Sequence, residues 1–263
     1  MNVTTVHGCE LVDGSVPVGT GDSGTADTAG TDAVYAEVAC DVTGRFVCEG
    51  RHHACIERRT ASPGDDLGAY FAGAWLSETT SVQAFLALAA ELERLGAPET
   101  LVARARTSAL DEIVHARLIA GFAAEQGATL GHAVFRRIPD RDPLSLAIEN
   151  AVEGCVRETF AAFVASHQSC AAAPEYRAAY RVIAEDEVRH AELAWAIDGW
   201  LLSQLDLAGR QQVEAAREAA VQEIYDAVTP PSAGAAAAGL PSVEASHRLL
   251  DGLVLHLWSR LAA

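Results

Sequence analysis

The sequence lacks the features that would place it in several large classes of protein. No apolar run approaches the roughly 20 residues that a membrane-spanning helix needs. The six cysteines include no C-x-x-C pair, and the first residues have neither the basic region nor the apolar core of a signal peptide. We therefore expect a cytoplasmic protein with reduced thiols and no membrane partner.

Basic residues are also scarce, because 19 Lys and Arg stand against 36 Asp and Glu, a formal net charge of −17. Such a surface repels the phosphates of nucleic acids, so we expect no nucleic-acid partner. Clusters of Val, Ile and Thr that would indicate strands are few, whereas alanine and leucine dominate. This composition predicts an all-α fold.

Composition divides the 263 residues into three parts. Residues 1–62 are rich in Gly, Ser, Thr and Asp in their first half, which predicts an irregular, partly flexible extension. A short hairpin turning near Gly44 fits its second half. Residues 63–205 carry the long helical patterns, and residues 206–263 are expected to add helices that pack on the bundle or on a partner, such as the second copy in a homodimer.

The second half of the extension holds three cysteines and two histidines, which raises the question of a zinc site. Their spacing matches no standard zinc finger, so an ordinary thiol-bearing flap is the favoured interpretation. The residues concerned are Cys40, Cys48, His52, His53 and Cys55.

Apolar residues at spacings of three and four predict four long helices. These helices cover residues of about 66–95, 98–127, 142–170 and 174–205. Their connections are short, long and short, as in a four-helix bundle with one crossover connection. Two further helices are expected after Asp206 and Ser242, joined by a plain linker of Pro, Gly and Ala residues.

The motif D-E-x-x-H occurs twice, in the second and in the fourth predicted helix. Residues three apart on a helix project from one face, so each Glu and its His point the same way. Both pairs interrupt apolar stripes and should therefore face the core, where an unpaired carboxylate costs several kcal/mol. The motif residues are Asp111, Glu112 and His115, and Asp186, Glu187 and His190.

The first and third helices supply one further glutamate each. The step along the chain from Glu78 to Glu112 has the same length as the step from Glu153 to Glu187. A phenylalanine, Phe85 or Phe160, follows the first glutamate of each step after seven residues. This regularity indicates an internal repeat of a helical hairpin, and two such hairpins would bring four glutamates and two histidines together.

These residues resemble the ferritin-like superfamily of dinuclear carboxylate proteins, over residues of about 66–205. The run from Glu153 to Thr159, E-G-C-V-R-E-T, is also similar to an uncharacterised bacterial ferritin-like group. The resemblance implies that Glu112 and Glu187 bridge two metals. It assigns Glu78, Glu112 and His115 mainly to one ion, and Glu153, Glu187 and His190 mainly to the other.

The resemblance also implies a role for the two aspartates. Asp111 would accept the free ring N–H of His190, and Asp186 would accept that of His115. Four ionised glutamates balance two divalent ions, and mixed oxygen and nitrogen ligands suit two Fe, with two Mn or a mixed Mn/Fe pair as alternatives.

For the reaction, we expect an oxidoreductase that uses O2 or peroxide, most simply a small-molecule oxygenase or oxidase with an unknown electron donor. The alternatives are a ferroxidase, a manganese catalase-like enzyme, or a bundle with a vestigial site. A tRNA-hydroxylase-like enzyme fits the net charge poorly. Rubrerythrin-like peroxidases carry an extra glutamate where this chain has Asn150, and arylamine N-oxygenases carry a histidine where it has Ile183.

Five neighbouring residues have weaker assignments. Glu149 and Arg157 could line a pocket, although a solvated helix start and a structural salt bridge are favoured. Glu158 is expected about 140° from Glu153 on an α-helix, and so in a structural role. Trp75 and Phe85 are expected in the core, where they could also form pocket walls.

Overall fold

The computed structural model describes residues 2–11, 38–45, 56–59, 66–135 and 140–258. The chain divides into two compact units, Met1–Phe46 and Val47–Ala263. The predicted zinc-type group lies almost entirely outside the described residues. None of the described helices is long and apolar enough to cross a membrane.

In the first unit, strand β1 (Asn2–Leu11) pairs antiparallel with strand β2 (Val38–Arg45). The turn predicted near Gly44 is wrong, because Gly44 lies inside β2 opposite Val3. The local sequence contains residues of strand type on both sides of Gly44. Their partner is the strand at the beginning of the chain, which periodicity within one segment does not reveal.

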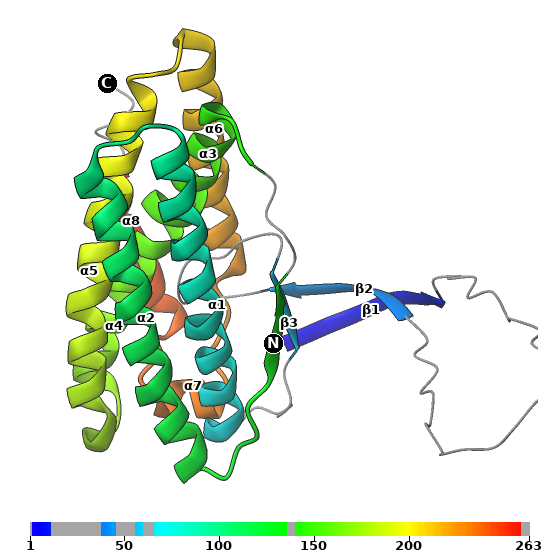
Figure 1. Cartoon of the computed structure of the whole chain (residues 1–263). Coiled ribbons are helices and arrows are strands. Elements are labelled where there is room, and N and C mark those ends of the chain that lie inside the picture. Colours follow the sequence, from blue (N-terminus) through cyan, green and yellow to red (C-terminus); the bar gives the residue numbers. More distant parts are fainter. Residues whose placement is uncertain (1, 12–37, 46–55, 60–65, 136–139, 259–263) are drawn as a thin grey trace, which may run out of the picture. The chain divides into compact units, whose positions relative to one another are not determined.

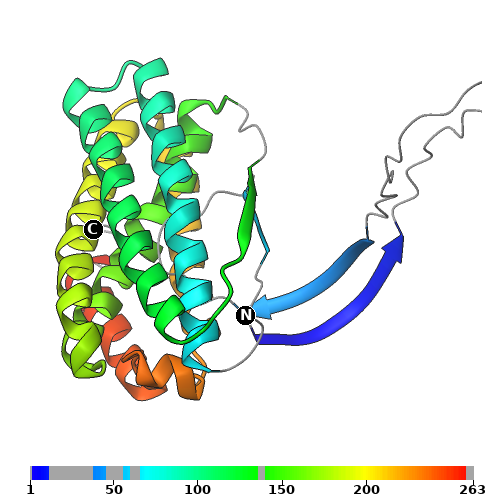
Figure 2. The same ribbon diagram turned by 60° about the horizontal axis from the view of Figure 1, so that its bottom comes forward.

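The second unit is mostly helical, as predicted for the all-α class. Helices α1 (Leu67–Arg94), α2 (Glu99–Glu125) and α5 (Pro174–Leu202) lie side by side with a third long segment (Figures 1 and 2). Helix α1 packs along α2, the third segment packs along α5, and α2 contacts α5. The third segment consists of α3 (Pro143–Glu149), η1 (Asn150–Glu158) and α4 (Thr159–Ala171).

Short local signals fix the ends of these helices. Asp66 and Asp142 each accept a hydrogen bond from the backbone N–H three residues on, at 2.7 Å, and so cap α1 and α3. Gly96 and Gly127 follow α1 and α2 with φ of 75° and 67°. This left-handed conformation suits glycine, which has no Cβ. The predicted helix starts and stops therefore agree closely with the structure.

Segment η1 differs from the sequence prediction of one uninterrupted helix over residues 142–170. Its nine residues, Asn150–Glu158, form a π-helix. A π-helix makes i→i+5 hydrogen bonds, is rare, and occurs frequently at functional sites. The apolar spacing of the sequence does not distinguish it from an α-helix, because the two differ only slightly in period. The directions in which its side chains project therefore depend on the structure.

Two inner clusters of buried apolar residues fill the space between the four long segments. On α1, α2 and α5, the acidic and histidine residues of the predicted site fall between the two clusters. One cluster includes Phe85, Leu101 and Leu193, whereas the other includes Phe71 and Ile119. The predicted polar residues thus interrupt one continuous apolar interior.

The C-terminal helices α6 (Leu207–Ala227) and α8 (Val243–His256) cover the third segment. An outer apolar cluster joins them to it, and includes Val156, Phe160, Val164, Ala220, Leu250, Leu253 and Trp258. Helices near the predicted positions are confirmed. The linker between them is not plain, because it contains the short helix α7 (Ala233–Ala237). A Cβ on Gly234 would lie 2.2 Å from the backbone of Asp66, so this glycine allows the close approach.

The long connection between α2 and α3 also contains regular structure that the sequence analysis missed. Strand β4 (His132–Phe135) pairs antiparallel with β3 (Ile56–Arg59), and both contact α1. The two strands are separated along the chain by the whole of α1 and α2, so no local pattern indicates the pairing.

Candidate metal centre

Three helices bring four ligand-type residues together in the interior. Glu78 comes from α1, Glu112 and His115 from α2, and Glu187 from α5, and one ligand atom of each lies within 4.8 Å of all the others. All four residues are buried, with at most 5 % of their surface exposed. A cluster of this composition, enclosed by apolar residues, could hold a metal ion.

His115 turns its Nδ1 toward three carboxylates. This nitrogen lies 3.5 Å from Oε2 of Glu78, 3.7 Å from Oε2 of Glu112 and 3.6 Å from Oε1 of Glu187. None of these contacts has hydrogen-bond geometry, and Nδ1 has no other hydrogen-bond partner among the described residues. Buried polar atoms are normally paired, so a set of orphaned acceptors around a ring nitrogen is the arrangement that a metal ion would satisfy.

His190 faces the same group from α5. Its Nδ1 lies 3.4 Å from Oε1 of Glu112 and 3.7 Å from Oε2 of Glu187, again without a hydrogen bond. Glu112 and Glu187 therefore each turn one oxygen toward His115 and the other toward His190. Within the described part of the chain, both oxygens of Glu112 and Oε2 of Glu187 are buried without a hydrogen-bond partner. Two carboxylates thus lie between two histidines.

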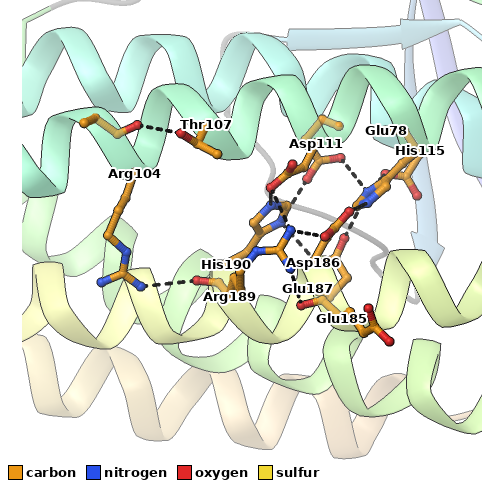
Figure 3. Close-up of polar contacts among 12 residues, drawn as sticks. Glu78, Arg104, Thr107, Asp111, His115, Glu185, Asp186, Glu187, Arg189 and His190 are labelled. Carbon is orange, nitrogen blue, oxygen red and sulfur yellow. Dashed lines mark hydrogen bonds and ion pairs between the residues drawn. The ribbon is translucent and has the colours of Figure 1, made fainter.

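The other ring nitrogen of each histidine contacts an aspartate of the facing helix. Nε2 of His115 lies 3.0 Å from Oδ2 of Asp186, and Nε2 of His190 lies 3.3 Å from Oδ2 of Asp111 (Figure 3). These are the two pairs that the sequence analysis named. Because each aspartate fixes Nε2 of a histidine, Nδ1 is left to face the glutamates.

Arg189 joins the two aspartates and was missed by the sequence analysis. Its Nη2 donates a hydrogen bond to Oδ1 of Asp186 and lies 3.6 Å from Oδ2 of Asp111. About half of its side chain is exposed, so it closes the group on the solvent side. Its position three residues after Asp186 on a helix was the available signal, since residues at this spacing are neighbours.

The ionisable side chains of the cluster shift one another's pKa values. Burial and the neighbouring Glu112 raise the pKa of Glu78 from 4.5 to about 7. Burial by itself would lower the pKa of His115, but the carboxylates of Glu112 and Glu78 raise it from 6.5 to about 12. Burial likewise opposes protonation of His190, yet Asp111, Glu112 and Glu187 raise its pKa well above 6.5. Without metal, protonated histidines therefore neutralise part of the acidic cluster.

Glu153 is not among the four residues that share the 4.8 Å cluster. Its Oε1 accepts a hydrogen bond from Nη1 of Arg157 at 3.1 Å, and its side chain is 13 % exposed. Arg157 also lies 3.0 Å from Glu223 of α6, so it forms a structural salt bridge, as the sequence analysis favoured. Neither Glu153 nor His190 is in the group of four, so the equal spacing of the two hairpins places Glu78, but not Glu153, in that group.

Phe160 does not occupy a place equivalent to that of Phe85. The seven-residue spacing on an α-helix would put Phe160 on the same face as Glu153, but Phe160 packs in the outer cluster against α8. The predicted angle of about 140° between Glu153 and Glu158 holds only for an α-helix. In η1 the hydrogen bonds join residues five apart, so that angle does not apply, and Glu158 is fully buried.

The remaining predicted residues lie around the cluster. Phe85 is fully buried, and its ring centroid is 4.9 Å from that of His190, so it packs against the site. Glu149 forms an ion pair with Arg141 at 3.3 Å, at the junction between the long connection and the third segment. Neither Phe85 nor Glu149 lines the groove between α1 and α2.

This groove is open and has a volume of about 350 Å³. Trp75 lines it, although the sequence analysis favoured core packing for this residue. Thr79 and Ile113, which also line it, lie directly after Glu78 and Glu112 in the sequence. The other lining residues are Val82, Gln83, Ala116, Arg117 and Ala120. The groove is therefore apolar with a few polar groups, as small-molecule sites generally are.

Comparisons of the chain with protein families, with curated proteins and with solved structures gave no match. The assignment of a function therefore depends on the geometry of the site.

Proposed function

We propose that the protein is a dinuclear non-haem metal oxidoreductase built on a ferritin-like four-helix bundle. The observation that supports this proposal best is the placement of Glu112 and Glu187. Each presents one oxygen to His115 and the other to His190. A carboxylate that bridges two metal ions requires this arrangement, with one ion beside each histidine.

The arrangement of the helices supports the bundle assignment. The α1/α2 and α4/α5 connections are short, the connection from α2 to α3 is long, and each short connection joins two helices that pack together. This order is that of a four-helix bundle with one crossover connection. The ligand-type residues project inward from facing helices, as they do in dinuclear carboxylate proteins of this architecture.

The donor set favours first-row metals that accept both oxygen and nitrogen ligands, and we propose two Fe. When bound, the metals would supply the redox chemistry toward O2 or peroxide, which protein side chains lack. The chain's own residues would hold the ions, fix the imidazole rings through Asp111 and Asp186, and exclude water with the two inner apolar clusters. The groove at Trp75, next to the helix positions of Glu78 and Glu112, would receive a small-molecule substrate.

Metal loading tests this proposal directly. Purified protein is stripped with a chelator, loaded anaerobically with Fe(II), desalted, and analysed for metal per chain. We expect two irons per chain, followed by O2 consumption and a new optical band on exposure to air. Parallel loading with Mn(II) separates iron from manganese preference. Stoichiometry well below two for both metals would contradict the proposal.

The time course after exposure to air separates the alternative functions. A ferroxidase would continue to oxidise and retain added Fe(II) beyond two ions per chain. A catalase-like enzyme would decompose peroxide with Mn bound and without an electron donor. A small-molecule oxygenase or oxidase, which we propose, would stop after one turnover until a donor is supplied.

A further inference from the structure

The two histidines do not have equivalent surroundings. Nδ1 of His115 faces three glutamates, Glu78, Glu112 and Glu187. In the part of the chain that the structure describes, the ion-pair contacts of Nδ1 of His190 are with two, Glu112 and Glu187. Three ionised glutamates also leave two divalent ions with one uncompensated positive charge. A fourth carboxylate beside His190 would neutralise this charge and make the two positions alike. Of the four long segments that the structure describes, the third has not yet supplied a ligand.

Glu158 lies on the inner face of that segment. It is the last residue of η1 and the N-cap of α4, with α-helical φ and ψ of −65° and −37°. Ala165 follows it by seven residues, almost two whole α-helical turns, so the two side chains project in nearly the same direction. Ala165 belongs to an inner cluster that it shares with Phe71 of α1 and Ile119 of α2. Val156 and Phe160 project instead toward the outer cluster.

Glu158 also lies at the level of the cluster along the helix axis. Helices α4 and α5 are joined by a two-residue connection, Ala172 and Ala173. Glu158 precedes the last residue of α4 by thirteen residues, and Glu187 follows the first residue of α5 by thirteen. Because an α-helix rises 1.5 Å per residue, both carboxylates are about 20 Å from the turn.

Burial and charge distinguish Glu158 from Glu153. Glu158 has no exposed surface, so its carboxylate lies wholly inside the protein, where the metal centre would lie. Glu153 is partly exposed and already has Arg157 at 3.1 Å as its cation, with Glu223 of α6 on the other side of that arginine. A metal ligand at Glu153 would have to give up this salt bridge.

We propose that Glu158 supplies the fourth carboxylate of the metal centre, as the terminal ligand of the ion beside His190. Glu153 instead anchors the π-helical segment to α6 through Arg157. This assignment rests on the proposed dinuclear function. It concerns only which residue of the third segment contacts the metal.

Two nearly isosteric substitutions test the assignment: Glu158→Gln, with Glu153→Gln as the matched control. Each variant and the wild type are loaded anaerobically with Fe(II) and, separately, with Mn(II), and the metal bound per chain is measured by titration and elemental analysis. We expect two ions in the wild type and in Glu153→Gln. For Glu158→Gln we expect one ion bound as in the wild type and a second bound at least tenfold more weakly.

The opposite pattern, with loss of the second ion in Glu153→Gln and full loading in Glu158→Gln, would overturn the assignment while leaving the dinuclear function intact. Full loading of both variants would overturn it as well. A wild type that binds fewer than two ions would refute the proposed function itself. Far-ultraviolet circular dichroism checks that each variant is folded. Glu158→Asp keeps the negative charge and should therefore bind the second ion more tightly than Glu158→Gln does.

Discussion

The hairpin of α1 and α2 carries its ligand-type residues on regular α-helix, whereas the hairpin of the third segment and α5 contains nine π-helical residues. The two hairpins agree in sequence spacing, since a glutamate precedes each D-E-x-x-H glutamate by the same number of positions. The two hairpins differ in the surroundings of that first glutamate. Glu78 enters the buried cluster, but Glu153 pairs with Arg157.

The difference between the hairpins has a physical cause. Helix α1 contacts α2, strands β3 and β4 and the short helix α7, whereas the third segment packs against the long helices α6 and α8. The apolar residues of the third segment are therefore divided between the inner clusters and the outer cluster, and Phe160 belongs to the outer cluster. A stripe that looks like the inner face of one bundle can thus be the contact face of an additional layer.

The largest expected effect concerns the glutamates that each hairpin places between the histidines. Replacing Glu112 or Glu187 by Ala should reduce metal content below one ion per chain, because each carboxylate would contact both ions. Glu78→Ala should retain the ion beside His190. Glu185→Ala, an exposed substitution on α5, serves as the control. Two ions per chain in Glu112→Ala would contradict the bridging role, as measured by elemental analysis after desalting.

The next effect is on stability without metal. The folded-state pKa of Glu78 lies at about 7, above its ordinary 4.5, so its contribution is present below pH 4.5 and is lost as the pH rises through 7. A shift of this size corresponds to about 3 kcal/mol. The raised pKa of His115 acts in the same direction from pH 6.5 upward, because the folded state keeps a proton that the unfolded state loses.

Thermal unfolding of the chelated protein should therefore show a lower Tm at pH 8 than at pH 5. The metal-loaded protein should have a higher Tm than the chelated protein at pH 8, because the ions replace the missing positive charge. Equal Tm values with and without metal at pH 8 would contradict burial of the cluster. Glu78→Gln should flatten the pH dependence of the metal-free protein and provides the matched comparison.

A smaller effect should separate the two phenylalanines that follow the paired glutamates. Phe160→Leu is expected to lower the free energy of unfolding by about 1 kcal/mol, through loss of packing against α8, without changing metal content. Phe85→Leu, at a similar cost, should also alter metal affinity or the optical spectrum of the loaded protein, because Phe85 contacts His190. If both substitutions changed metal binding equally, Phe85 and Phe160 would occupy equivalent positions beside the site, and the two hairpins would be equivalent after all.

The smallest expected effect is that of Arg189, which contacts the aspartates of both hairpins. Arg189→Gln should weaken binding of both ions by a similar factor, about threefold to tenfold, because half-exposed ion pairs contribute little. Arg181→Gln, also exposed on α5, is the control. Weakening of only one ion would show that Arg189 supports a single aspartate–histidine pair, and titration with Mn(II) measures both affinities.

The sequence by itself determined the helices and most of the cluster. Proline, glycine and capping aspartates give helix ends through strictly local chemistry, and the D-E-x-x-H spacing places a glutamate and a histidine on one helical face. The resemblance to dinuclear carboxylate proteins implied the contacts of Asp111 with His190 and of Asp186 with His115, which the structure shows. The helix ends and the shared helical faces depend only on residues a few positions apart.

Only the tertiary structure revealed the π-helix in the third segment and the pairing of strand β2 with the beginning of the chain. A π-helix differs too little from an α-helix in period for apolar spacing to indicate it, yet it turns every later side chain to a new direction. Several contacts join residues that are far apart in the sequence. They are the packing of α6 and α8 on the third segment, the pairing of β3 with β4, and the ion pairs of Arg157 with Glu223 and of Arg189 with Asp111. Such contacts are set by packing, which a local pattern does not contain.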